Sequence, residues 1–238
     1  MDRRDFVRTG GTLALAAAGA AVLELKNMPA VAQTAVSPAV SPAGYKPLPL
    51  SVDPKAIAGL SANLITSHYD NNYSGAVRRL NAIDQQLQAL DFDKADGFLI
   101  NGLKREQLMA ANSMILHEAY FASLGQGGDP TGNLAGAVER DFASVAKWRF
   151  EFSAMGKALG GGSGWVLLAY SPRLGRLINQ WSADHTMTTA DGAVILALDM
   201  YEHAYHMDYG ARAAAYVDAF MKVINWRNAA GLYEARGR

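Results

Sequence analysis

The stretch Leu198-Asp199-Met200-Tyr201-Glu202-His203-Ala204-Tyr205 follows an apolar run over 193–198 that predicts a buried strand. Asp199 and His203 stand four residues apart where this strand ends. A buried carboxylate needs a strong partner, and a metal cation is the partner that also accounts for a histidine arriving from the same turn. The stretch therefore predicts two ligands of a metal ion.

Further ligands have to come from a short list of residues, because the chain contains five histidines and no cysteine. Without cysteine, disulfides, thiolate catalysis and iron–sulfur clusters are excluded, and a metal must rest on histidine and carboxylate ligands. His68 and His117 each fall on the apolar face of a predicted helix, where a single histidine is more often a hydrogen-bonded core residue than a ligand. Three imidazoles and one carboxylate suit iron, manganese, cobalt or zinc without separating them.

Hydrophobic spacing elsewhere predicts helices first and strands later. The expected elements are two long helices over 51–90, helices over 104–124 and 134–155, strands over 165–170, 176–181 and 193–198, and a closing helix over 205–224. Helices alone, followed by a helix, three strands and a helix, indicate an α+β fold.

The first 32 residues have the plan of a signal peptide, with a charged start, a weakly apolar run and the small residues Ala30-Val31-Ala32. Arg3 and Arg4, followed one residue later by Phe6, resemble the twin-arginine signal, whose route carries folded proteins. The alternative, an uncleaved amphipathic helix, is disfavoured by the glycines of the run. We expect a periplasmic or otherwise exported protein with a linker over 33–44 and no stable membrane anchor. The net charge of zero gives no electrostatic support for a nucleic-acid partner.

Five segments, in their order and spacing, resemble the iron/manganese superoxide dismutase family, and the resemblance covers almost the whole chain from Tyr45. They are His68 with Val77-Arg78-Arg79-Leu80-Asn81, His117-Glu118-Ala119-Tyr120-Phe121, Gly162-Ser163-Gly164-Trp165, Asp199-x-x-Glu202-His203-Ala204-Tyr205, and Ile224-Asn225-Trp226. The resemblance implies a helical-hairpin domain over 45–126 and an α+β domain over 127–238 with a three-stranded antiparallel sheet. It also implies one Fe or Mn ion per chain, held between the two parts by His68, His117, Asp199 and His203.

Members of this family convert superoxide into dioxygen and hydrogen peroxide, and the resemblance implies no catalytic residue beyond the metal ligands. Glu202 matches the glutamate that reaches across a dimer interface to the ligand histidine of the other subunit, where such a contact fixes the tautomer. This implies a homodimer or a dimer of dimers. The expected small-molecule partner is superoxide or another small oxidant.

Residues around the expected metal depart from the family pattern. Active members carry a gateway histidine four residues after the first ligand and a gateway tyrosine eight after it, and here these positions hold Asn72 and Ala76. Tyr73 is not expected to replace that tyrosine, because five residues along an α-helix is a rotation of about 140° from His68. His206 stands where the family has a tyrosine that meets the gateway histidine at the dimer interface.

A glutamine that hydrogen-bonds the metal-bound solvent is also missing from both of its usual positions. The iron type places it at Ser113, and the manganese type places it in the loop that contains His185. His185 is the candidate replacement, and the alternative is a solvated loop histidine. Tyr201, in place of a tryptophan, and Trp165 complete the residues expected near the ligands or at the dimer interface.

Three functions agree with these observations. They are a superoxide dismutase, a metal-dependent oxidoreductase of the same fold acting on another substrate, and a metal-holding homologue without activity. The intact ligand set argues against the third function, and the altered gateway argues against the first. Superoxide dismutase is the leading interpretation, with turnover slower than in typical members.

Overall fold

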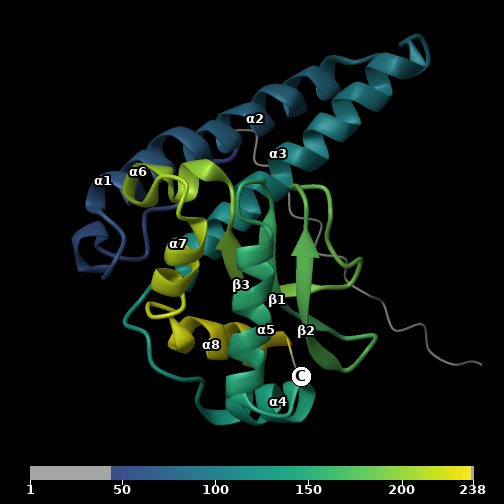
Figure 1. Cartoon of the computed structure of the whole chain (residues 1–238). Coiled ribbons are helices and arrows are strands. Elements are labelled where there is room, and N and C mark those ends of the chain that lie inside the picture. Colours follow the sequence, from purple (N-terminus) through teal and green to yellow (C-terminus); the bar gives the residue numbers. More distant parts are fainter. Residues whose placement is uncertain (1–43, 237–238) are drawn as a thin grey trace, which may run out of the picture. The chain divides into compact units, whose positions relative to one another are not determined.

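A computed structural model describes residues 44–236 of the chain, and these belong to one compact unit (Figure 1). The predicted signal peptide over 1–32 and nearly all of the linker lie outside the described residues. Among the described residues, no helix has the length and apolar character needed to cross a membrane.

The first long helical run is continuous, so the expectation of two separate helices within 51–90 was wrong. A short 3-10 turn, Pro54–Ala56, is followed by α1 (Ala62–Ser67), a π-helical segment (His68–Tyr73) and α2 (Ser74–Ala89). Gly59 has φ of 83°, a conformation that excludes a helix there. Ser61 then caps α1 by accepting a hydrogen bond from the Leu64 N–H at 3.0 Å.

The second arm of the hairpin is α3 (Gly97–Ser123), which begins several residues before the predicted start at 104. It packs against α2 along much of its length, and the pair projects beyond the sheet (Figure 1). Two glycines in its first turns, Gly97 and Gly102, weaken the sequence signal for a helix there.

The helix expected over 134–155 is two helices, α4 (Gly132–Phe142) and α5 (Val145–Ala158). Ala143 takes the left-handed conformation, with φ of 68°, and ends α4. Ser144 then caps α5 by accepting the Lys147 N–H at 3.0 Å. An alanine gives no sequence warning of such a break, which explains the missed boundary.

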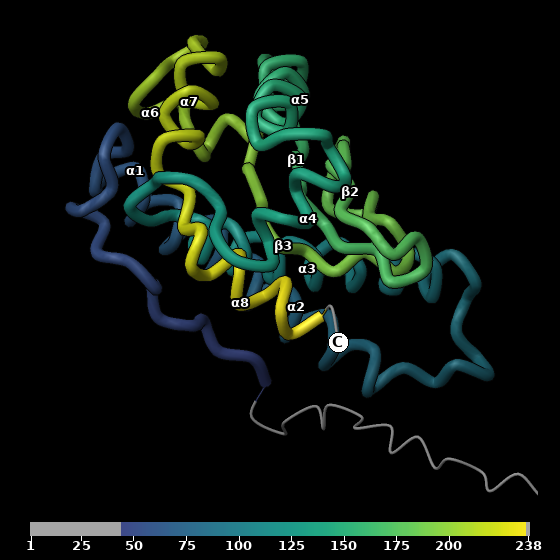
Figure 2. Tube along the Cα trace, turned by 90° about the horizontal axis from the view of Figure 1, so that it is seen from below, coloured from purple at the N-terminus to yellow at the C-terminus, as the bar shows by residue number. Residues whose placement is uncertain are grey.

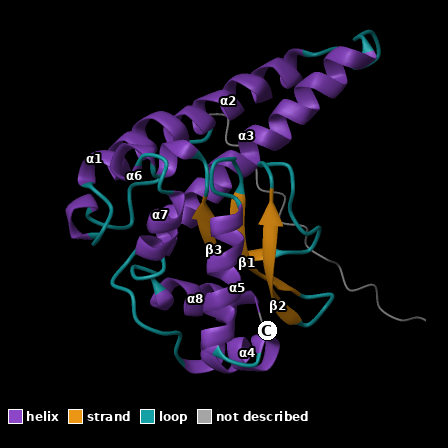
Figure 3. Ribbon diagram, viewed as in Figure 1, coloured by secondary structure: helices purple, strands orange, loops and turns teal. Residues whose placement is uncertain are grey.

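The predicted strands are confirmed to within one residue as β1 (Trp165–Ser171), β2 (Arg176–Ser182) and β3 (Ala193–Asp199). They form an antiparallel sheet in the order β2-β1-β3 (Figure 3), so the fold is α+β as predicted. The register places Trp165 opposite Asp199 on one side and Ser182 on the other. This pairing places the candidate ligand Asp199 beside the aromatic residue Trp165 at one end of the sheet.

The C-terminal part consists of several short helical elements, so the expectation of a single helix over 205–224 was wrong. It contains a 3-10 turn (Glu202–Ala204), α6 (His206–Tyr209), α7 (Ala213–Phe220) and α8 (Trp226–Arg236), the last of which was not predicted. Gly210, with φ of 54°, separates α6 from α7. Helices α3 and α8 pack against β3, and α5 packs against β1 and β2, so the sheet is covered on both faces (Figure 2).

Candidate metal centre

The four predicted ligands come together from four different elements. His68 is the first residue of the π-helical segment, His117 lies in the last third of α3, Asp199 ends β3, and His203 lies in the 3-10 turn that follows. One ligand atom from each lies within 4.8 Å of every other. The π-helical segment agrees with a functional site, since π turns inside α-helices are frequently found at such sites.

All three imidazoles direct Nε2 at a single oxygen. The distance to Asp199 Oδ2 is 3.1 Å from His68, 3.3 Å from His203 and 3.7 Å from His117. Ligand atoms about 2.1 Å from a common ion, at angles of 90–120°, are roughly 3.0–3.6 Å apart. The spacing of these atoms therefore fits a first-row transition-metal ion.

The buried nitrogens support the same assignment. His68 Nε2 and His117 Nε2 are both buried and have no hydrogen-bond partner among the described residues. A buried polar atom without a partner costs about 1–3 kcal/mol, and a metal ion would satisfy both atoms at once. The donor set and its orphaned atoms thus fit a bound ion.

Protonation states in this cluster also favour a metal. Burial lowers the pKa of His68, and burial lowers the pKa of His117 to about 3. Burial alone would raise the pKa of Asp199, but the His203 and His68 imidazoles beside its carboxylate outweigh burial and hold the pKa well below its usual range. At neutral pH these two imidazoles are neutral and the carboxyl group is ionised, which are the forms that bind metal.

Neighbouring groups fix the orientation of two ligands. His117 Nδ1 lies 2.6 Å from the Ser113 carbonyl and donates its proton there, which leaves Nε2 free to bind. Asp199 Oδ1 accepts the Tyr201 N–H at 2.8 Å, and the Tyr216 hydroxyl donates to the Asp199 carbonyl at 2.8 Å. Tyr216 was missed in the sequence, because only the packing of α7 against this end of β3 brings it here.

His185 lies beside this cluster, in the loop between β2 and β3. The Trp165 indole N–H donates to His185 Nδ1 at 3.0 Å. Because an indole nitrogen is only a donor, Nδ1 must be unprotonated and the neutral ring carries its proton on Nε2. The His185 ring stacks on Tyr201 at 4.9 Å and lies 6.2 Å from the His117 ring, while burial lowers the pKa of His185. It is therefore a positioned, half-buried group rather than a solvated loop histidine.

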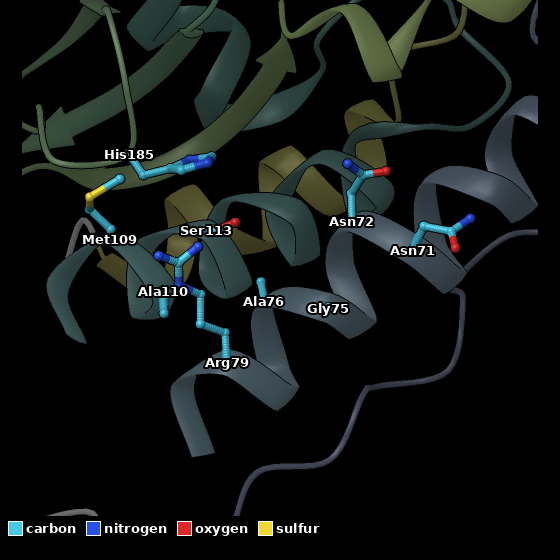
Figure 4. Close-up of a pocket in the computed structure, with 9 residues that line it drawn as sticks. All are labelled: Asn71, Asn72, Gly75, Ala76, Arg79, Met109, Ala110, Ser113 and His185. Atoms are coloured by element: carbon cyan, nitrogen blue, oxygen red, sulfur yellow. The ribbon is translucent and has the colours of Figure 1, made fainter. Parts of the chain in front are cut away.

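A cavity of about 290 Å³ lies between the π-helical segment, α2, α3 and the His185 loop (Figure 4), and none of the four ligands is among its lining residues. Nine residues line it: Asn71, Asn72, Gly75, Ala76, Arg79, Met109, Ala110, Ser113 and His185. Both altered gateway positions and both positions considered for the missing glutamine thus face one space. No role in the site was predicted for Arg79 or Met109, because their place in the lining depends on how α2 and α3 approach each other.

Tyr73 belongs to a different environment, although its ring is 6.4 Å from the His117 ring. Its hydroxyl donates to Glu118 Oε1 at 2.8 Å and accepts the Leu48 N–H at 2.7 Å. It is absent from the cavity lining. The α-helical rotation assumed for it does not apply to a π-helical segment, but the conclusion holds that Tyr73 does not occupy the gateway position.

The two residues expected at a dimer interface, Glu202 and His206, are exposed. In the described part of the chain, the Glu202 carboxylate makes no hydrogen bond or ion pair. Neither residue lines the cavity, and their role at a dimer interface stays a prediction.

Comparisons with known proteins give one family. The description "Iron/manganese superoxide dismutases, C-terminal domain" matches residues 130–231. An iron superoxide dismutase of Cupriavidus metallidurans is 63% identical over 194 residues, which is 82% of this chain and 98% of the relative. A manganese superoxide dismutase of Halobacterium salinarum is 33% identical over 74% of this chain and 87% of its own length. An iron superoxide dismutase of Pyrobaculum aerophilum is 32% identical over 70% and 81%.

Proposed function

The chain belongs to the iron/manganese superoxide dismutase family, and on that premise we propose that it is an iron-type enzyme holding one ion with His68, His117, Asp199 and His203. Its reaction is the conversion of superoxide to dioxygen and hydrogen peroxide. The observation that carries the site is the convergence of three imidazole nitrogens on Asp199 Oδ2. The preference for iron rests on the 63% identical relative, which is named an iron enzyme, because the donor set itself does not separate iron from manganese.

When bound, the ion supplies the redox couple through which one superoxide is oxidised to dioxygen and the next is reduced. The reduced product takes up two protons, so proton donors have to lie near the bound ion. His185 is proposed for this role, since Trp165 fixes its tautomer with the proton on Nε2. Ser113 and Asn72 are further donors in the same lining, and Ala76 contributes none.

Metal analysis of the purified protein, followed by a superoxide assay on protein reloaded with iron or with manganese, tests this proposal. We expect one iron per chain and turnover in the iron-loaded form. If the manganese-loaded protein turns over superoxide faster than the iron-loaded protein, manganese replaces iron as the proposed metal. Fully loaded protein of either kind without superoxide turnover would refute the activity.

We also propose export by the twin-arginine route, on the basis of Arg3-Arg4 and the mild apolar run after them. Replacing both arginines by lysine should leave the precursor in the cytoplasm, as measured by fractionation and immunoblotting. Unimpaired export of that variant would contradict this route.

A homodimer is proposed from Glu202, whose exposed carboxylate follows the buried strand end and directly precedes His203. A partner carboxylate that accepts a proton from a ligand imidazole would fix its tautomer and raise its basicity. Glu202→Ala should shift the protein toward monomer in sedimentation and weaken metal retention. A wild-type protein that sediments as a monomer at assay concentration would overturn the proposal.

A further inference from the structure

The loop over 183–192, between β2 and β3, carries His185 and is fastened to the sheet by side chains of β2. Gln180 Nε2 donates to the Met187 carbonyl at 2.9 Å, and Gln180 Oε1 accepts the Thr189 N–H at 2.8 Å. The Ser182 hydroxyl also donates to the Met187 carbonyl. These bonds hold the second half of the loop, and none of them reaches the backbone of His185.

Asn112, in α3, supplies the contact that the sheet does not. Its Nδ2 donates to the His185 carbonyl at 2.5 Å. In the part of the chain that the structure describes, this is the one hydrogen bond between α3 and the loop over 183–192. Figure 4 shows His185 beside Ser113, the α3 residue that follows Asn112. The bond therefore ties the loop to the helical hairpin at the residue whose side chain approaches the ligands.

His185 is thus held from two different parts of the fold. Asn112 fixes its carbonyl from α3, and the Trp165 indole fixes its ring from β1 by donating to Nδ1 at 3.0 Å. The ring carries its remaining proton on Nε2 and lies 6.2 Å from the ring of the ligand His117. A misplacement of about 1 Å in such a group is enough to change turnover strongly. The bond from Asn112 therefore helps to set the distance between the Nε2 proton and a bound ion.

We propose that Asn112 is a positioning residue for superoxide turnover, whose amide fixes the His185 backbone on α3 and so sets how closely the His185 imidazole approaches the metal. The inference rests on the proposed function, in which His185 supplies a proton near the ion. Asn112 belongs neither to the four ligands nor to the cavity lining, so its effect has to pass through His185. It should consequently disappear when the His185 imidazole is removed.

The test is a double-mutant cycle in iron-loaded protein with Asn112→Ala, His185→Ala and the double variant. Superoxide turnover per bound ion and the reduction potential of the iron are measured for each protein. We expect Asn112→Ala to lower turnover about two- to tenfold, the range that corresponds to one net hydrogen bond. Its potential should shift in the same direction as that of His185→Ala. The double variant should match His185→Ala in both quantities.

Two further variants separate the hydrogen bond from other effects. Asn112→Leu has a similar volume and no donor, so it should behave like Asn112→Ala. Asn101→Ala is the matched control, because Asn101 is an exposed asparagine of the same helix and lies outside the cavity lining. Hydrogen exchange of the loop over 183–192, followed by mass spectrometry on loaded protein, should become faster in both Asn112 variants and stay unchanged in Asn101→Ala.

Losses from Asn112→Ala and His185→Ala that add up in the double variant would overturn the positioning role. Wild-type turnover and potential in Asn112→Leu would overturn it as well. A loaded wild type without superoxide turnover would refute the proposed function instead. In that protein the potentials and the exchange of the loop would still report whether Asn112 acts through His185, so the two failures are distinguishable.

Discussion

Replacing His203 by alanine should weaken metal binding at little cost to the fold. The His203 side chain is 27% exposed, whereas the other three ligands are at most 2% exposed. A metal ion present at a thousand times its Kd stabilises the folded state by about 4.1 kcal/mol. If the loss of one coordinating side chain weakens metal affinity about 100-fold, this stabilisation falls to about 1.4 kcal/mol. The difference, about 2.7 kcal/mol, corresponds to roughly 5–11 °C in unfolding temperature for a domain of this size.

The assay is calorimetric unfolding of wild type, His203→Ala and His206→Ala, each with and without metal, together with the metal content of each protein. His206 is the matched control, because it is an exposed histidine three residues later and outside the ligand cluster. We expect His206→Ala to keep the metal-induced shift and the metal-free proteins to unfold at similar temperatures. Full metal occupancy with an unchanged shift in His203→Ala would refute the assignment of this ligand.

Three further predictions concern turnover and stability. The double variant Asn72→His/Ala76→Tyr should gain at least about tenfold in superoxide turnover by stopped flow, because it supplies the missing gateway donors, and no gain over an equally loaded wild type would contradict this. Trp165→Phe removes the donor to His185 and should lower turnover about tenfold at unchanged metal content, whereas unchanged turnover would show that the tautomer is irrelevant. Burial alone would raise the pKa of Asp141, but hydrogen bonds from an arginine and a backbone N–H outweigh it and lower the pKa. Its stabilising effect is therefore present above the unfolded-state pKa and is lost as pH falls through the lower folded value. Asp141→Asn should cost about 1–3 kcal/mol of unfolding free energy at pH 7 by denaturant titration, and a cost that does not shrink as pH falls well below the unfolded-state pKa of about 4 would count against this reasoning.

The strands could be predicted from the sequence almost to the residue, and several helix boundaries could not. Each strand is a short apolar run between turn residues such as Pro172 and Gly175, and this local signal agrees with the burial in the fold. The break at Ala143 depends on a left-handed backbone that alanine does not favour, so it is imposed by the packing of α4 and α5. Local propensity is a weak guide wherever tertiary packing decides the backbone.

The ligands were predictable because a buried carboxylate and a histidine on one turn leave few alternatives to a metal. The groups around the ligands were harder to predict from the sequence. Trp165 reaches His185 only because the sheet register sets Trp165 opposite Ser182, from which the His185 loop begins. Tyr216 reaches Asp199 across 17 residues of chain, and no periodicity in the sequence connects the two.

Metal binding and turnover are consequently set by different parts of this molecule. The ligand atoms depend on backbone positions, namely the end of β3, the π-helical segment and α3, and these are buried in the common core. The cavity depends on side chains that α2, α3 and one loop present to a space open to small molecules. Substitutions at Asn72 or Ala76 are therefore expected to change proton supply while the metal stays bound. Because of this separation, the chain can keep all four metal ligands although it lacks the usual gateway pair.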